Sequence, residues 1–383
     1  MRASEYVQLD PLVILARSHD LVLHSRVEGY EPRFFFELTY EERDFFEWGG
    51  WLAVRPIEEL PYWRCVMRRE RDHKGMRQIA NAHGAAIEFA RQILRERETV
   101  TSRDFPKDGP ALDHYRGSRP ASLALYYLWR TGEAMTHHRE RFQRVYARTE
   151  AVAPERLLSE APEEETDLFL ARKAVAFAGI GRISRVGQPI GRLLARTTAR
   201  TEERKIAESL VDANITTAVE VEGWRGTQYV LNQDLERLAC IARGGIPPEW
   251  QTSAGDESPQ VSLLSPLDPV AARGRSKLLF DYDYNWEIYL PAEQVRFGRY
   301  ALPILWGDRL IGRIDMKLDR STGTVVVNGL WLEDPQSARD PQFIRALGLE
   351  LHRLLSLVGA NACDFKAVAD PRLRKTLSTL ANG

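Results

Sequence analysis

The chain has 383 residues, which is more than one ordinary domain holds and predicts about two to four folded units. Hydrophobic residues make up 44% and charged residues 28%, which excludes a disordered chain, and no stretch approaches the roughly 18 uncharged apolar residues of a membrane helix. The net charge of −1 excludes a uniformly basic nucleic-acid-binding protein. The three scattered cysteines support neither a disulfide framework nor a zinc site, and no apolar signal core follows Met1, so a cytoplasmic protein without a membrane partner is expected.

The first feature along the chain is the tripeptide Gln8-Leu9-Asp10. In an extended segment alternate side chains point the same way, so Gln8 and Asp10 are predicted to share one face while Val7 and Leu9 point into the core. A carboxylate beside a carboxamide can hold and polarise one water molecule, which is the minimum that hydrolysis needs. The alternative is a surface glutamine followed by an aspartate that caps a helix beginning at Pro11.

Aromatic side chains are unusually dense in the first 62 residues, which are expected to be helical after the opening motif. These side chains either stack on nucleic-acid bases or fill a hydrophobic core. Glycines at 49 and 50 predict a turn into a short extended piece that ends near Pro56.

The middle of the chain repeats one order of elements: helix, turn, helix and β-hairpin, which is the order of a winged helix. The first copy is predicted from helices at 75–98 and 120–130 and from strands at 133–138 and 142–146, with a possible capping box at Thr101–Asp104. The second copy is predicted from helices at 168–178 and 201–211 and from strands at 216–222 and 227–231. The turn Gly223-Trp224-Arg225-Gly226 joins the last two strands, so that this wing would present Trp224 and Arg225 to DNA.

After a glycine- and proline-rich linker at 244–259, the pattern changes to short strands. Six are predicted, at 260–264, 278–282, 286–290, 299–305, 309–317 and 324–327. Strands at this spacing are typical of a small antiparallel barrel or curled sheet. A helix is predicted from Pro341 to Val358, followed by a polar tail.

Positive charge is concentrated in patches although the chain as a whole is nearly neutral. The segment from Arg172 to Lys205 holds nine Lys or Arg residues and two acids, and it follows an acidic run from Glu160 to Asp167. Two further basic clusters lie at 64–77 and 137–148. Such patches are typical of a protein that binds the phosphate backbone of a nucleic acid through particular surfaces. The alternative is that these residues are ordinary solvent-exposed positions on helices.

The sequence offers no cofactor or metal site. Gly179-Ile-Gly-Arg-Ile-Ser184 lacks the third glycine of a dinucleotide fingerprint and follows no predicted strand. There is no HExxH motif, and the neighbouring His137 and His138 would point apart in a strand. No cofactor and no metal are therefore predicted.

Four stretches, taken in order, resemble the YcaQ/AlkZ family of bacterial winged-helix DNA glycosylases. They are Val7-Gln-Leu-Asp-Pro11 with Arg26; Leu128-Trp-Arg-Thr-Gly132 with His138-Arg139 and Arg144-Val-Tyr146; Leu263-Leu-Ser-Pro-Leu-Asp-Pro269; and Phe280 to Pro291 with Arg296 to Pro303. The resemblance implies an α+β chain in which tandem winged helix-turn-helix domains are followed by a small antiparallel C-terminal β-barrel. It also implies a monomer near the nucleoid that wraps damaged duplex DNA, hydrolyses the N-glycosidic bond of N7-alkylated purines and unhooks interstrand crosslinks.

The resemblance places the domains at 1–70, 71–160 and 161–243, a linker at 244–259 and the barrel with its terminal helix at 260–383. Gln8 and Asp10 match the Gln–apolar–Asp form of the family's catalytic motif, which is that of the YcaQ-like branch. Family members carry helices before this motif, so the first winged helix is expected to be shortened, or the true start to lie upstream.

The remaining predicted site residues hold the DNA backbone, from the basic segment, the wing and the barrel. They are Arg172, Lys173, Arg182, Arg185, Arg192, Arg196, Trp224, Arg225, Arg273, Arg275, Arg296 and Arg299. Two other functions stay open: a non-catalytic winged-helix DNA-binding protein or transcription regulator, and a degenerate paralogue that binds lesions without cutting. The pair Gln8 and Asp10 favours an enzyme over a transcription regulator, because a regulator does not need a water-activating pair beside the duplex.

Overall fold

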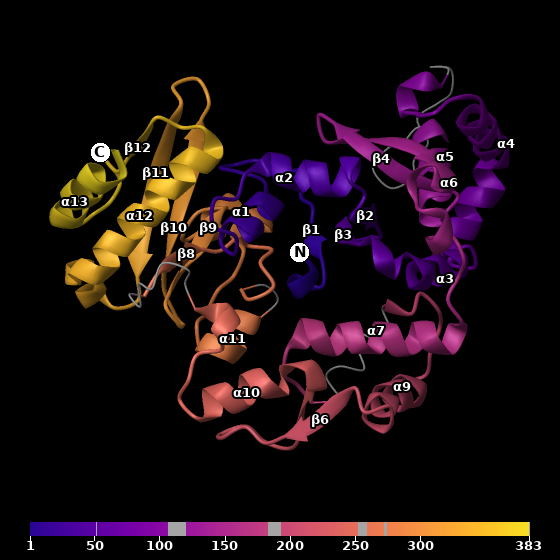
Figure 1. The fold of residues 1–383 in the computed structure, drawn as a ribbon. Helices are drawn as coiled ribbons and strands as arrows, with labels where there is room; N and C mark the ends of the chain where they lie inside the picture. Colours follow the sequence, from indigo (N-terminus) through magenta and orange to yellow (C-terminus); the bar gives the residue numbers. More distant parts are fainter. Residues whose placement is uncertain (51, 106–119, 183–192, 252–258, 272–273, 383) are drawn as a thin grey trace. The chain divides into compact units, whose positions relative to one another are not determined.

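A computed structural model describes residues 1–50, 52–105, 120–182, 193–251, 259–271 and 274–382 (Figure 1). The chain forms two compact units, each of mixed helix and sheet as predicted. The first unit comprises Met1–Tyr6 and Glu37–Gln251, and the second comprises Val7–Phe36 and Thr252–Gly383. The predicted domain limits inside these units stay predictions.

In the described residues, the first half of unit 1 contains two hairpins, three helices of eleven residues or more and the short helix α6 (Thr149–Val152). A short 3-10 turn, η1 (Arg2–Ser4), and a π-turn, η2 (Glu37–Glu41), precede the hairpin of β2 (Phe45–Trp48) and β3 (Ala53–Pro56). The helices are α3 (Leu60–Glu70), α4 (Lys74–Glu96) and α5 (Pro120–Arg130), and the second hairpin is β4 (Ala134–Glu140) with β5 (Gln143–Arg148). The helices at 75–98 and 120–130 and the hairpin after them are confirmed, as is the extended piece that ends at Pro56, which is β3. The helix expected before the turn at Gly49 and Gly50 is wrong at β2, whose residues form a buried strand.

The second half of unit 1 repeats this order with shorter strands. Its elements are α7 (Glu163–Ala178), α9 (Arg200–Asp212), the hairpin of β6 (Thr216–Val219) with β7 (Gln228–Leu231), and α10 (Leu235–Ala242). Buried side chains of both halves, such as Trp129, Leu170 and Leu231, belong to one continuous hydrophobic core. The predicted elements are thus present twice, and their assignment as winged helices stays a prediction.

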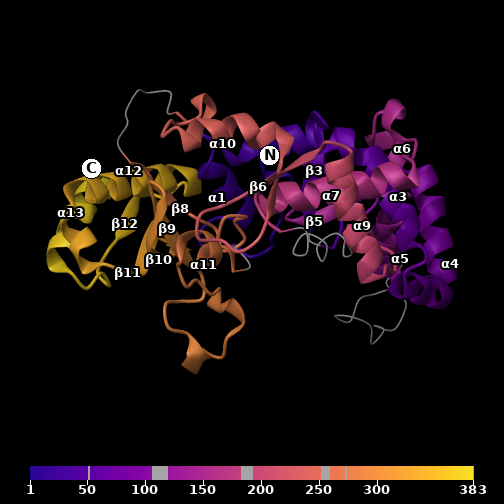
Figure 2. The ribbon, with the colours of Figure 1, turned by 90° about the horizontal axis from the view of Figure 1, so that it is seen from below.

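Unit 2 is organised around a five-stranded sheet, on which α12 packs (Figures 1 and 2). The strands, in their order across the sheet, are β12 (Ala362–Asp364), β11 (Thr324–Leu332), β10 (Arg309–Asp319), β9 (Ala301–Trp306) and β8 (Val261–Leu263). The helices are α1 (Ser18–His24), α2 (Pro32–Phe36), α11 (Arg275–Phe280), α12 (Pro341–Val358) and α13 (Pro371–Asn382).

The helix α12 has the limits that the sequence predicts, because strong signals mark both ends. The Asp340 carboxylate accepts the amides of Gln342 and Phe343, and Pro341 occupies the first turn, where its missing N–H costs nothing. Gly359 ends the helix in the left-handed conformation with φ at 64°. Phe343 and other apolar residues on one face of α12 enter the core of the sheet.

The expected antiparallel barrel or curled sheet is one five-stranded sheet in the described residues, and its closure into a barrel stays a prediction. The sheet is not antiparallel throughout, since β12 runs parallel to β11 because α12 carries the chain back between them. Other expectations for this part of the chain are wrong. The predicted strand at 278–282 is the end of α11, enclosed by left-handed residues at Gly274 and Asp281, and that at 286–290 is a 3-10 turn, η8 (Glu287–Tyr289). The polar tail instead forms β12 and the amphipathic helix α13, whose apolar residues face the core.

Candidate active site

The tripeptide Gln8-Leu9-Asp10 lies in unit 2 and has the predicted alternation. Val7 and Leu9 are each 1% exposed, whereas Gln8 and Asp10 are partly exposed. Val7 and Gln8 form the short strand β1. The side chains of the candidate pair therefore stand on the accessible face of a segment that is anchored by two buried apolar residues.

The alternative that Asp10 caps a helix is wrong. Residues 11–17 are not helical, and the next helix, α1, begins at Ser18. Instead, Oδ1 of Asp10 accepts the amide of Leu12 at 2.8 Å, which closes an Asx turn. This bond fixes one oxygen of the carboxylate.

Three hydroxyl groups of unit 2, those of Ser18, Ser265 and Tyr300, act on one another, and the charge of Asp10 acts on that of Tyr300. Tyr300 is buried at 2% exposure, and burial together with the negative charge of Asp10 raises the pKa of its hydroxyl, while the hydroxyls of Ser265 and Ser18 act in the opposite direction. The hydroxyls of Ser18 and Ser265 are hydrogen-bonded to each other. Asp10, Ser265 and Tyr300 come from three of the four stretches that carry the resemblance, so the fold brings these distant stretches together.

A buried ion pair holds the same region. Both guanidinium NH groups of Arg26 donate to the carboxylate of Asp268, at 2.6 and 2.8 Å, and Asp268 is completely buried. Asp268 Oδ1 also accepts the amide of Val270, and Ser265 Oγ accepts the amide of Leu267. Arg26 thus ties the chain after α1 to the turn that carries Ser265.

The loop from 281 to 300 carries two of the predicted DNA-binding residues. It projects from the sheet in Figure 2, as the orange segment between α11 and β9. The buried carboxylate of Glu287 accepts the amides of Arg296 and Phe297, both at 2.9 Å, while Arg299 donates to the carbonyl of Ile288. Arg296 and Arg299 are exposed on this braced loop.

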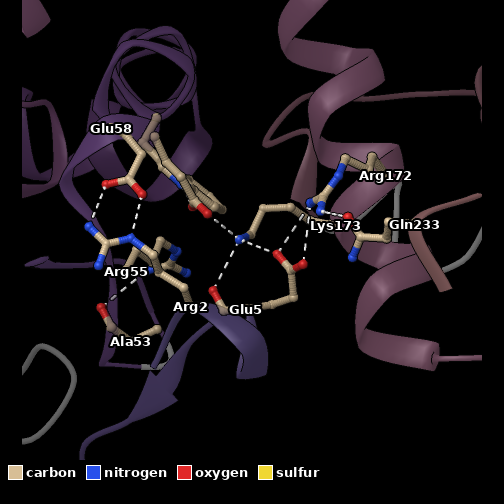
Figure 3. A network of polar contacts seen from close by, with 10 residues as sticks. Arg2, Glu5, Ala53, Arg55, Glu58, Arg172, Lys173 and Gln233 are labelled. Carbon is tan, nitrogen blue, oxygen red and sulfur yellow. Dashed lines mark hydrogen bonds and ion pairs between the residues drawn. The ribbon is translucent and has the colours of Figure 1, made fainter. Parts of the chain in front are cut away.

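The predicted DNA-binding residues of α7 lie in a polar network of unit 1 (Figure 3). Arg172 binds Glu5 and Gln233, each at 3.2 Å. Lys173 is 5% exposed, and its ammonium binds Glu5 at 2.8 Å and Glu59 at 2.6 Å. The prediction that Lys173 contacts DNA does not fit this burial, because its charge is already neutralised by two carboxylates.

The other predicted DNA-binding residues vary in exposure. Arg196 pairs with Asp167 and Glu202, each at 2.6 Å, and Arg182 lines a cavity of about 490 Å³ with Tyr229. Residues Trp224 and Arg275 are partly exposed, and Arg225 is exposed in the turn between β6 and β7. The predicted residues Arg185, Arg192 and Arg273 lie outside the described residues.

Two arginines of the basic cluster at 64–77 are neutralised by the acidic run at 160–167. Arg68 pairs with Glu160 and Glu163, and Arg69 pairs with Glu163 and Asp167. Burial opposes ionisation of Glu163, but its hydrogen bonds to the two arginines outweigh burial and lower its pKa to about 2. Arg68 and Arg69 therefore form ion pairs within the protein and have a structural role.

A second neutralised cluster surrounds Glu47 on β2, a residue that sequence reasoning missed. Its buried carboxylate accepts from Arg139 at 2.5 and 2.8 Å, from Arg144 at 2.5 Å and from the Tyr40 hydroxyl at 3.2 Å. Burial alone would raise the pKa of Glu47, but the charges of Arg144 and Arg139 lower it. A single acid among aromatic residues gives no sequence signal, because its two arginine partners are more than ninety residues away.

Among the described residues, no three His, Cys, Asp or Glu side chains are grouped as a metal ion would require, and no helix is both long and apolar enough to cross a membrane. The family model described as DNA glycosylase AlkZ-like matches residues 1–357. The solved structure of the DNA glycosylase AlkZ of Streptomyces sahachiroi is similar, with a TM-score of 0.59 and 14% identity over 94% of this chain and 90% of that chain. The chain therefore belongs to the AlkZ-like DNA glycosylase family.

Proposed function

We propose that this protein hydrolyses the N-glycosidic bond of N7-alkylated purines in duplex DNA, with Asp10 and Gln8 as the catalytic pair. The observation that carries the proposal is the alternation at residues 7–10, which leaves a carboxylate and a carboxamide side by side above buried Val7 and Leu9. The Gln–apolar–Asp form of the motif supports our further proposal that the chain belongs to the YcaQ-like branch of the family.

The chemistry needs no general acid. Alkylation at N7 places a positive charge on the purine, so the base is already a good leaving group. The protein must stabilise an oxocarbenium-like sugar and deliver water to it. Because Oδ1 of Asp10 is held by the Leu12 amide, we assign acceptance of the water proton to Oδ2, while Gln8 orients that water.

The proposed substrates include interstrand crosslinks. A crosslinked base cannot easily be swung out of the helix as base-flipping enzymes require, so we propose that the protein acts on the stacked base while tandem winged helices wrap the duplex. We further propose that it works as a monomer in the cytoplasm at the nucleoid. The backbone contacts are assigned to Arg172, Arg182, Arg185, Arg192, Arg196, Trp224, Arg225, Arg273, Arg275, Arg296 and Arg299.

The test is single-turnover base release from a duplex that carries one N7-methylguanine, read out as strand cleavage after alkaline treatment. Asp10→Asn should slow release by about 100- to 1,000-fold, the usual loss for a group that stabilises charge in the transition state. Gln8→Ala should slow release by less, since it orients water but offsets no charge. Tight duplex binding without base release by the unaltered protein would refute the enzymatic function and favour a DNA-binding protein.

A further inference from the structure

We propose that Arg26 and Asp268 are positioning residues for Asp10. With Ser18 and Ser265 they form a clamp that holds both ends of α1 and so fixes the segment that carries the candidate carboxylate. The inference rests on the proposed role of Asp10. It assigns a role to Arg26 and to the stretch around Asp268, which carry the family resemblance but take no part in the proposed chemistry.

The clamp holds α1 at both ends from a single turn. At the start of the helix, the hydroxyls of Ser18 and Ser265 are hydrogen-bonded to each other, and both residues are completely buried. Two residues after its end, the guanidinium of Arg26 donates to both oxygens of Asp268, at 2.6 and 2.8 Å. Ser265 and Asp268 belong to one turn, in which the Asp268 amide donates to the Ser265 carbonyl at 2.8 Å. The helix therefore cannot shift along its axis without breaking one of these contacts.

The turn that forms one side of the clamp is itself held in place. The Leu264 amide donates to the carbonyl of Pro303 on β9 at 3.0 Å, which attaches the turn to the sheet. Within the turn, Ser265 Oγ accepts the amide of Leu267 and Asp268 Oδ1 accepts the amide of Val270. Because the Asp268 carboxylate is completely buried, it depends on these donors and on the charge of Arg26.

The segment between Asp10 and α1 is closed on itself, so a displacement of the helix is passed on to Asp10. Arg17, the residue directly before the helix, donates to the carbonyl of Pro11 at 3.4 Å and forms an isolated β-bridge with Val13. The Leu12 amide donates to Oδ1 of Asp10 at 2.8 Å. Hydrogen bonds thus connect the start of α1 to the carboxylate itself.

The same segment has a second attachment, which does not depend on the clamp. The carbonyl of Ile14 accepts the amide of Leu318 on β10 at 3.1 Å, and Leu15 is buried in the core of unit 2. A weakened clamp should therefore leave the segment folded against the sheet but less precisely placed. In an active site, a displacement of about 1 Å is enough to slow a reaction about 100-fold.

The first readout is hydrogen exchange of the full chain, followed by mass spectrometry, and it does not depend on activity. Asp268→Asn keeps the shape of the side chain but removes the charge that faces Arg26. The amides of residues 10–17 should then exchange about tenfold faster, as expected when a hydrogen bond to a charged group is weakened. Ser265→Ala, which removes only the contact with Ser18, should accelerate their exchange by less, and it serves as the milder variant if Asp268→Asn does not fold.

The matched control is Asn382→Ala in the same unit. The Asn382 side chain binds both backbone groups of Cys363, at 2.7 and 3.1 Å, and so joins α13 to β12. This variant should lower the Tm of unit 2 as well, but it should leave the exchange of residues 10–17 unchanged, because neither residue belongs to the clamp.

Base release then separates positioning from stability. Well below the Tm of each variant, and with enough protein to saturate the duplex, Asp268→Asn should slow single-turnover release about 100-fold. Its Kd for the duplex should stay unchanged. Combined with Arg26→Ala, Asp268→Asn should add no further loss, since the two residues act as one unit, and an additive loss would contradict that coupling.

Two results would overturn the proposal. One is exchange at residues 10–17 that matches the Asn382→Ala control in both Asp268→Asn and Ser265→Ala. The other is slower release that is fully explained by weaker duplex binding. If the unaltered protein releases no bases, the proposed function fails, whereas the exchange comparison still decides whether the clamp positions the segment.

Discussion

Glu47→Gln should destabilise unit 1 strongly, although the substitution changes the shape of the side chain little. The Glu47 side chain is fully buried between Arg139 and Arg144, whose side chains are 10% and 15% exposed. Glutamine keeps an acceptor oxygen but removes the negative charge. Two guanidinium groups would then lie in a poorly solvated site without a counter-charge.

Loss of one partner from a buried ion pair costs about 3–5 kcal/mol, and the acceptor that glutamine keeps places this change near about 3 kcal/mol. A folded unit of 150–250 residues loses about 2–4 °C of Tm per kcal/mol, and unit 1 falls in this size range. The expected fall in Tm is therefore about 6–12 °C. Differential scanning calorimetry at pH 7 measures it.

The pH dependence has a fixed sign. Because the folded pKa of Glu47 is lowered, its ion pairs contribute fully above the ordinary glutamate value of 4.5. The contribution disappears as the pH falls through the lowered folded pKa. The difference in Tm between the unaltered protein and Glu47→Gln should therefore stay constant above about pH 5 and shrink below about pH 4.

Glu208→Gln is the matched control in the same unit. Arg204 binds Glu208 at 2.7 Å, but the two side chains are 74% and 47% exposed, so the same substitution should cost less than about 1 kcal/mol. Equal changes in Tm for the two variants, or a difference for Glu47→Gln that grows on acidification, would refute the account of Glu47 as a buried counter-charge.

Three further predictions follow from single contacts. Gly298→Ala should lower the Tm of unit 2, because Gly298 has a φ of 103° and an added Cβ would collide with the Asp315 carboxylate. Arg225→Ala should reduce the slope of log Kd against log salt concentration for duplex binding by about one. An unchanged slope in this variant would argue against a contact between Arg225 and a phosphate. Lys173→Ala should lower thermal stability without altering that slope, since its ammonium neutralises Glu5 inside the protein; a reduced slope would restore it as a DNA contact.

The sequence predicted those elements whose causes are local. The helix α12 follows from a capping aspartate, a first-turn proline and a terminal glycine, and the hairpin of β6 and β7 follows from the glycines of its turn. The segments at 278–282 and 286–290 were mistaken for strands because short apolar runs have no period that separates helix from strand. The first of them belongs to α11, which lies between left-handed residues at Gly274 and Asp281 that the residue pattern did not reveal.

The candidate site was predictable in part for the same reason. The alternation of Val7, Gln8, Leu9 and Asp10 is a property of four consecutive residues, and the structure has it. Burial and then the charge of Asp10 raise the pKa of the Tyr300 hydroxyl, although Tyr300 is 290 positions from Asp10 in the sequence. No spacing rule connects residues at such a separation.

The stretches that carry the family resemblance divide into two kinds of residue, and charge alone does not separate them. Arg139 and Arg144 lie in such a stretch and read as a phosphate-binding patch, yet both are held by Glu47 inside unit 1. Arg26 and Asp268 likewise belong to these stretches and neutralise each other in unit 2. A charged residue in a shared motif can therefore stabilise the fold without contacting the substrate. The exposure of each arginine and its ion pairs together indicate which arginines are able to bind DNA.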